Sequence, residues 1–256
     1  RVVSFRPDAV FAFVSWVAND YGTVHSRIDI LRAVRSGEAY TTVPQIDPGG
    51  ELLLSVRGWT RVRRVLALID AVCAAGPRHL TVISNNTGSG ETGVSALLRE
   101  GLVDKVVCSY PRSRGSVWFE RLYEQNAIEL ELVPQGTLAE RIRAAGAGLG
   151  GFYTPTGYGT ALAEGKRTEI IDGVGHVFET PLFADVALLK AERADRWGNL
   201  VYYKTARNFN PIMATAARTV IAEVSAVVGL GDIDPEQVVT PGIFVDHVIE
   251  TEQAVA

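Results

Sequence analysis

The chain has 256 residues, of which 47% are hydrophobic and 21% charged, enough for one large domain or two small ones around a sizeable core. Its net charge of −4 argues against nucleic acid as the main partner. A membrane-spanning helix needs roughly 20 consecutive apolar residues. The sequence has no such run, so we expect no membrane contact and a cytoplasmic location.

Cysteine and histidine usage gives no sign of a metal centre. Cys73 and Cys108 both lie in apolar runs and are expected to be buried, reduced thiols. No spacing of cysteines and histidines resembles a metal site. The four histidines are scattered along the chain, and we assign none of them a catalytic or ligand role.

Residues 1–55 fit no recognisable pattern, and we leave this N-terminal segment unassigned. Residues 11–17 are mostly apolar, and residues 52–56 predict a strand. An unusual concentration of positive charge follows, because four arginines fall within eight residues. These are Arg57, Arg61, Arg63 and Arg64.

Predicted helices and strands alternate from residue 66 onward. Residues 66–75 predict a helix, and the apolar run at 79–84 predicts a buried parallel strand that leads into Asn85. A helix at 93–99 and a strand at 105–109 follow. Ligands of open α/β sheets bind at the carboxyl ends of strands, which makes Asn85 a candidate site residue. An asparagine at this place also commonly caps the next helix.

The middle of the chain carries the most distinctive pattern. Residues 129–133 predict a short strand, and Pro-Gln-Gly at 134–136 predicts a tight turn. Thr137 and Glu140 have the spacing of a capping box, which predicts a helix that stops at Gly146. A long glycine-rich loop follows, and glycine lets a backbone approach another group closely.

The C-terminal third continues the alternation. Residues 165–178 predict a hairpin with Asp172-Gly173 as its turn. Residues 184–191 and 219–224 predict two further strands. Together with the preceding elements they predict one α/β domain with a mostly parallel sheet.

Several blocks of this chain resemble the A (alpha) subunit of family I CoA-transferases. They are V-P-Q-G-T-L-A-E-R-I-R-A-A-G-A-G at 133–148, F-Y-T-P-T-G-Y-G-T at 152–160, S-N-N at 84–86, A-D-R-W-G-N-L at 194–200, T-A-R-N-F at 205–209 and T-P-G-I-F-V at 240–245. K-V-V-C-S-Y-P-R at 105–112 looks most like the 3-oxoadipate branch of the family. The resemblance covers about residues 66–250 and implies a three-layer α/β sandwich, in a domain that we place at 56–256.

The resemblance weakens before residue 66. The family has a glycine-rich loop, V-G-G-F-G-x-x-G-x-P, ahead of a helix that starts with L-I-D. Val56, Gly58 and Trp59 align with its valine, second glycine and phenylalanine, while the other glycines and the proline are absent. The resemblance implies that Gly58 and Trp59 contact CoA, whose phosphates the nearby arginines attract unless these form a solvated helix face. Another hypothesis is that residues 1 to about 65 come from a shifted reading frame.

The resemblance also implies a reaction. CoA would move from succinyl-CoA to 3-oxoadipate or a similar 3-oxo acid by covalent catalysis on a glutamate carboxylate. In two-chain members that glutamate lies in an E-N-G-type motif of the B (beta) subunit, which this chain lacks, so a B subunit is the expected partner. Glu91, in a glycine-rich turn, is not expected to replace it. CoA esters would be substrates, with no permanently bound cofactor.

The resemblance assigns roles to three residues of the central blocks. Gln135 and Asn85 match residues that stabilise the oxyanion and position the substrate. Gly136 is expected to contact the CoA ester. Arg112 or Arg114 either neutralises the second carboxylate of a dicarboxylic substrate or is a surface charge.

Two other functions stay open at this point. One is a hydrolase of the same fold, in which water accepts the acyl group. The other is a non-catalytic subunit, made so by the altered glycine-rich loop.

Overall fold

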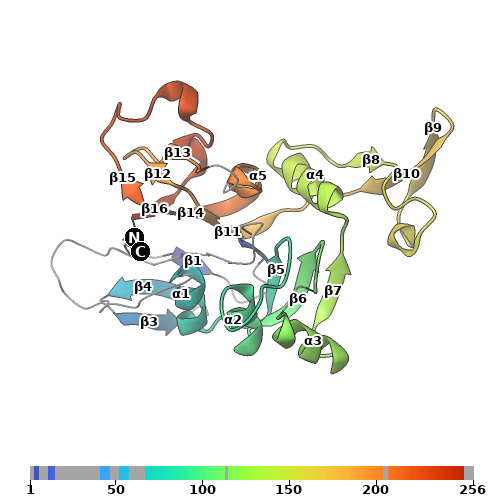
Figure 1. Cartoon of the computed structure of the whole chain (residues 1–256), viewed down its shortest axis with the longest axis horizontal. Coiled ribbons are helices and arrows are strands. Elements are labelled where there is room, and N and C mark those ends of the chain that lie inside the picture. Colours follow the sequence, from blue (N-terminus) through green and yellow to red (C-terminus); the bar gives the residue numbers. More distant parts are fainter. Residues whose placement is uncertain are drawn as a thin grey trace.

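The computed structural model describes residues 3–5, 11–14, 41–46, 52–57, 67–112, 115–203 and 207–250. Figure 1 shows helices packed around a central sheet and an antiparallel arm that projects from this body. No helix within these ranges is both long enough and apolar enough to cross a membrane.

The central sheet is parallel throughout, as the sequence predicts. Its seven strands have the order β16-β14-β11-β2-β5-β6-β7. Strands from the middle of the chain lie on one side of β2, and strands from its last third lie on the other. The bounds are β2 Phe11–Val14, β5 Leu80–Ile83, β6 Val103–Cys108, β7 Glu129–Leu132, β11 Ala184–Lys190, β14 Ala217–Val224 and β16 His247–Glu250.

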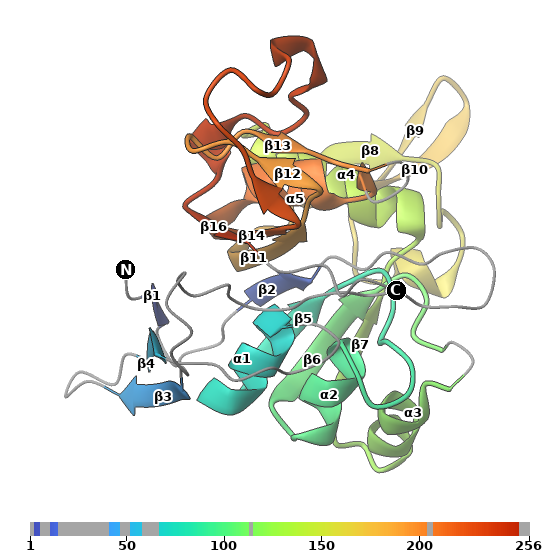
Figure 2. The ribbon, with the colours of Figure 1, turned by 60° about the vertical axis from the view of Figure 1, so that its left-hand side comes forward.

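Helices cover both faces of this sheet. Successive side chains of a strand point to opposite faces. Val82 and Val106 therefore join an apolar cluster with α1, α2 and α3, while Ile83 and Val107 join a second cluster with α4 and α5. Figure 2 shows these two groups of helices on opposite sides of the strands. The three-layer sandwich is confirmed. The helices are α1 Ala67–Ala75, α2 Val94–Arg99, α3 Val117–Glu124, α4 Gln135–Gly146 and α5 Asn210–Ala216.

Three smaller sheets surround the central one. A sheet of order β1-β4-β3 contains the strand predicted at 52–56, so that strand lies outside the parallel sheet. The unassigned N-terminal segment contributes β2 to the central sheet, between β11 and β5. A sheet of order β13-β12-β15 follows the carboxyl ends of β11 and β14. The bounds are β1 Val3–Phe5, β3 Thr41–Ile46, β4 Leu52–Arg57, β12 Arg193–Ala194, β13 Leu200–Val201 and β15 Ala226–Val227.

The arm in Figure 1 is an antiparallel sheet of order β8-β10-β9. Its strands are β8 Phe152–Thr154, β9 Thr168–Ile171 and β10 Val174–Glu179. Asp172 and Gly173 join β9 to β10 with φ of 50° and 78°. A two-residue type I′ turn requires positive φ at both positions, so the predicted hairpin and its turn are confirmed.

The glycine-rich loop packs against the chain's own arm. A Cβ added at Gly151 would lie 2.4 Å from Cζ of Phe178 on β10. A Cβ added at Gly175 would lie within 2.3 Å of the ring of Tyr158, which belongs to the loop. Both glycines are therefore needed where loop and arm meet.

Helix α4 begins earlier than the sequence predicts. Pro134 is its N-cap residue and Gln135 its first helical residue, and no side chain caps it. Thr137, the predicted cap, is buried inside the first turn, while Glu140 binds Arg143 instead of closing a capping box. Proline pre-sets the backbone for a helix start, which explains why the Thr-x-x-Glu spacing misleads here.

Candidate functional site

Three parallel strands bring Asn85, Ser109 and Gln135 to one edge of the sheet. Asn85 follows the carboxyl end of β5, Ser109 follows β6, and Gln135 opens α4 three residues after β7. Because neighbouring parallel strands end at the same edge, residues up to 50 positions apart in the sequence become neighbours. The two residues predicted to form the site, Gln135 and Asn85, are in direct contact.

The side-chain oxygen of Asn85 is the centre of this group. Gln135 Nε2 donates to Asn85 Oδ1 at 3.0 Å, and Ser109 Oγ lies 2.5 Å from the same oxygen. The backbone oxygen of Asn85 accepts from the N–H groups of Ser109 and Tyr110, at 3.2 and 2.9 Å. Asn85 is thus fixed from both sides, and the orientation of its amide is set by two donors.

These contacts leave donors available at the site. Within the described residues, Asn85 Nδ2 donates to no other group, and Gln135 Nε2 uses one of its two hydrogens. The amide of Gln135 is exposed and that of Asn85 is half-buried. Two neutral amides can therefore present N–H groups to an oxygen that gains negative charge.

An apolar pocket lies beside Asn85, between β5, α4 and α5. Asn85 and Ser84 are its polar members. Phe209 brings the T-A-R-N-F block into the site, a role that the sequence gave no reason to assign. The full lining is Ile83, Ser84, Asn85, Leu138, Ile142, Phe209 and Met213.

The other predicted site residues differ in what the structure says of them. Gly136 is exposed next to Gln135, and a Cβ added there would meet nothing within 4 Å. Gly58 and Trp59, like Arg114, lie outside the described residues. Arg112 is exposed, and its Nε lies 3.9 Å from Glu120 Oε1.

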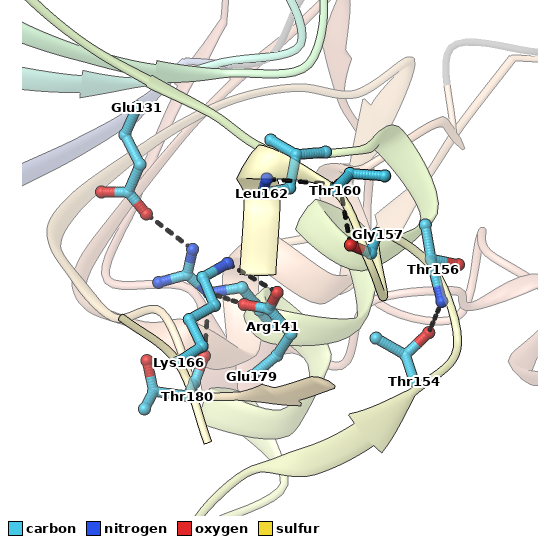
Figure 3. A network of polar contacts seen from close by, with 10 residues as sticks. All are labelled: Glu131, Arg141, Thr154, Thr156, Gly157, Thr160, Leu162, Lys166, Glu179 and Thr180. Atoms are coloured by element: carbon cyan, nitrogen blue, oxygen red, sulfur yellow. Dashed lines mark hydrogen bonds and ion pairs between the residues drawn. The ribbon is translucent and has the colours of Figure 1, made fainter. Parts of the chain in front are cut away.

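A buried arginine in the second turn of α4 fixes this helix below Gln135. Figure 3 shows Arg141 between Glu131 of β7 and Glu179 of β10. Its Nη1 donates to Glu131 Oε1 at 2.7 Å, and its Nε donates to the Thr180 carbonyl at 2.9 Å and lies 3.9 Å from Glu179 Oε2. Lys166 donates to Glu179 Oε1 at 2.7 Å. We call Glu131, Arg141, Lys166 and Glu179 the ion cluster.

The ion cluster perturbs one of its own carboxyl groups. Burial acts to raise the pKa of Glu131, but hydrogen bonds and attraction from Arg141 and Lys105 outweigh it, so the pKa lies below its ordinary value. The Arg141 side chain is only 9% exposed. The sequence pattern gave Arg141 no role, although a charged residue on the buried side of a helix was a usable signal.

Two groups near the site are unreactive. Cys108, directly before Ser109, is buried and its carbonyl accepts from the N–H of Val133 at 2.9 Å. Burial raises the pKa of its thiol to about 12. Glu91 is exposed, with Arg99 Nη1 at 3.0 Å and Trp118 Nε1 at 3.2 Å. No carboxylate within the described residues hydrogen-bonds to Asn85, Ser109 or Gln135.

The fold and the site together define a class. This is a three-layer α/β protein with uncharged amide donors at the carboxyl edge of a parallel sheet, an arrangement suited to polarising a carbonyl oxygen. The family model described as Coenzyme A transferase matches residues 45–251, and the chain belongs to this family. A second family model, described as a protein of unknown function, matches residues 1–87 and overlaps the first.

Similar proteins of known sequence carry consistent names, and all three described here are the A chains of two-subunit enzymes. That of the 3-oxoadipate CoA-transferase of Pseudomonas putida is 60% identical over 189 residues, covering 74% of this chain and 82% of that protein. Its counterpart in Acinetobacter baylyi is 53% identical over 212 residues, with 83% and 92% covered. That of the succinyl-CoA:3-ketoacid coenzyme A transferase of Xanthomonas campestris pv. campestris (strain B100) is 54% identical over 183 residues, with 72% and 75% covered.

A solved structure shows the same fold. Glutaconate coenzyme A-transferase from Acidaminococcus fermentans matches with a TM-score of 0.66 at 19% identity. The match covers 76% of this chain and 69% of that chain.

Proposed function

We propose that this chain is the A (alpha) subunit of a cytoplasmic 3-oxoacid CoA-transferase that moves CoA from succinyl-CoA to 3-oxoadipate or a similar 3-oxo acid. The domain responsible is proposed to span residues 56–256. The partner would be a B subunit that supplies the nucleophilic glutamate. The names of the relatives support this proposal, since each is the corresponding subunit of a CoA-transferase.

The observation that carries the proposal is the Asn85–Gln135 contact. In the proposed reaction a carboxylate of the partner attacks the thioester carbonyl, and the carbonyl oxygen takes a negative charge in the tetrahedral intermediate. The C–S bond then breaks and CoA leaves as the thiolate, which later attacks the acyl-enzyme to form a CoA thioester of the glutamate. N–H groups of Asn85 and Gln135 would donate to the negative oxygen at both carbonyl centres.

Neutral donors suit this task better than charged ones. An amide keeps its hydrogens at every pH at which the protein is folded, so it can donate without titrating. The hydroxyl of Ser109 and the amide of Gln135 both bind Asn85 Oδ1, which holds the Nδ2 hydrogens away from these two groups. We therefore assign Ser109 a positioning role, while Asn85 and Gln135 touch the reacting oxygen.

The test is an activity assay with and without a partner. The purified chain alone should not transfer CoA from succinyl-CoA to 3-oxoadipate, and activity should appear when a CoA-transferase B subunit is added. Glu91→Ala should leave the activity of the assembled enzyme unchanged, because the carboxylate of Glu91 is bound to Arg99 away from the amide pair.

Three outcomes would contradict the proposal. Turnover by the isolated chain that Glu91→Ala abolishes would place the nucleophile in this subunit. Faster acyl transfer to water than to 3-oxoadipate would identify a hydrolase. Full binding of the B subunit without transfer to either 3-oxoadipate or acetoacetate would identify a non-catalytic subunit.

A further inference from the structure

The tip of the arm exposes an unusual amount of apolar surface. Ile170, Ile171 and Val174, on the two sides of the Asp172-Gly173 turn, are 60%, 37% and 50% exposed. Tyr158, from the glycine-rich loop, is 43% exposed. We call these four residues the arm tip.

The apolar residues occupy both faces of the hairpin. Ile171 pairs with Val174 across the strands, and Ile170 pairs with Gly175. Neighbouring residues of a strand face opposite sides, so Ile171 and Val174 lie on one face and Ile170 on the other. The ring of Tyr158 lies against Gly175 and therefore on the face of Ile170. A hairpin with apolar residues on both faces has no face that water solvates well, which is typical of a protein interaction surface.

The base of the arm is held firmly, in contrast to its tip. Lys166, just before β9, binds Glu179 at the end of β10, and Glu179 lies beside Arg141 of the body (Figure 3). Tyr153 and Phe178 pack edge to face with ring centres 5.2 Å apart. The guanidinium of Arg167 lies over both rings. The arm tip is therefore presented in one orientation, and little conformational entropy is lost when a partner binds it.

The position of the arm identifies the occupant. Its base shares Arg141 with α4, the helix whose first residue is Gln135, so the arm rises beside the candidate site. Within the described residues, this site has oxyanion donors but no carboxylate bound to them. The chain that completes the site must approach this side of the molecule, next to the arm.

We propose that the arm tip is the surface on which the subunit that carries the nucleophilic carboxylate docks. This rests on the proposed function, because that function places the nucleophile in a second chain. The hairpin seats its apolar residues in an apolar recess of the partner, and the partner covers both faces of the tip. The docking sets the distance between the partner's carboxylate and the Asn85–Gln135 pair.

The test measures assembly separately from catalysis. The probe is the B subunit of the 3-oxoadipate CoA-transferase of Pseudomonas putida, whose A chain is 60% identical to this one. The variant Ile170→Thr/Ile171→Thr/Val174→Thr removes apolar surface but keeps the β-branched residues that strands prefer. The matched control is Val227→Thr in β15, a strand valine that is 37% exposed away from the arm. Ile170→Asp is a second, independent variant.

We expect both tip variants to raise the Kd for the B subunit at least about 30-fold, the effect of losing a central contact of an interface. Val227→Thr should change the Kd less than twofold. At a saturating concentration of B subunit, kcat of the tip variants should return to that of the unchanged chain, because the tip does not touch the substrate. Thermal unfolding of each variant alone should match that of the unchanged chain.

The outcomes separate this proposal from the proposed function. An unchanged Kd in both tip variants, with full transferase activity, overturns the docking proposal alone. A B subunit that binds through the tip without any transferase activity overturns the proposed function alone. If the variants weaken self-association of this chain while binding of the B subunit is unaffected, the tip joins two copies of the chain and the docking proposal is wrong. If the unchanged chain does not bind the B subunit, both are wrong.

Discussion

Two polar groups hold the same helix, α4, and they are built in opposite ways. At its first residue, Gln135 makes a neutral amide contact in a partly exposed position. At its seventh residue, Arg141 makes charged contacts in a buried position. Neutral groups with hydrogens left over suit the binding of a ligand, whereas charges that satisfy one another suit the fixing of an element. The contrast places function at the start of α4 and support in its second turn.

Removing the buried cation should give the largest effect on stability. Arg141→Met keeps much of the length of the side chain but leaves Glu131 and Glu179 without the charge between them. Breaking a buried ion pair in this way typically costs about 3–5 kcal/mol in free energy of unfolding. Urea unfolding of the isolated chain measures it. The matched control is Arg143→Met, two residues along, whose exposed pairing with Glu140 should contribute nothing measurable.

The same variant should shift the acid limit of stability. The pKa of Glu131 in the folded chain is below its ordinary value of 4.5, so its contribution is fully present above that value and is lost as the pH falls through the folded pKa. Without Arg141, burial raises the pKa of Glu131, and the loss should begin at higher pH. Unfolding curves between about pH 3 and pH 7 measure this, and an unchanged pH profile would contradict the assigned role of Arg141.

Removing the neutral amide should affect catalysis rather than stability. Gln135→Ala should lower kcat of the assembled enzyme about 100-fold or more, because a lost oxyanion donor has that effect. Gln135→Glu should be at least as damaging, since a carboxylate would face the developing negative charge. Steady-state kinetics with the B subunit present, together with thermal unfolding, measure both. Near-normal kcat in both variants would make Gln135 only a structural residue at the start of α4.

The smallest effect tests whether a ligand approaches the backbone next to Gln135. Gly136→Ala adds a methyl group that meets nothing within 4 Å in the chain itself, so stability should be unchanged or slightly higher. If the CoA ester lies against Gly136, the KM for succinyl-CoA should rise several-fold. Gly150→Ala, which also has open space around it, is the control. Equal KM values in both variants would show that the ester does not contact Gly136.

Much of the fold could be predicted because its signals are local. The continuous apolar run of β5 identified a strand buried on both faces, and Asp172-Gly173 identified a hairpin turn. The start of α4 was predicted wrongly, because Thr137 and Glu140 have capping-box spacing but tertiary packing buries Thr137. Local spacing does not contain that information.

The candidate site could be predicted only in part, for a similar reason. Asn85 and Gln135 were found through the motifs that contain them, and the structure brings them into contact. Ser109 and Arg141 lay inside the same motifs without an assigned role, since their partners are 24 and 39 residues away or on another strand. The projection of the arm depends on how β8 and β10 leave the body, and no residue pattern encodes that direction.

Cys108 offers a way to observe the site without substrate. Its thiol is fully buried, and with a pKa of about 12 it stays protonated at neutral pH, so alkylating reagents react with it slowly. Its backbone carbonyl holds Val133, the residue that leads into α4. Alkylation therefore requires local opening of the strands beneath Asn85 and Gln135. The rate of modification would serve as a clock for that opening, with the half-buried Cys73 on α1 as an internal reference.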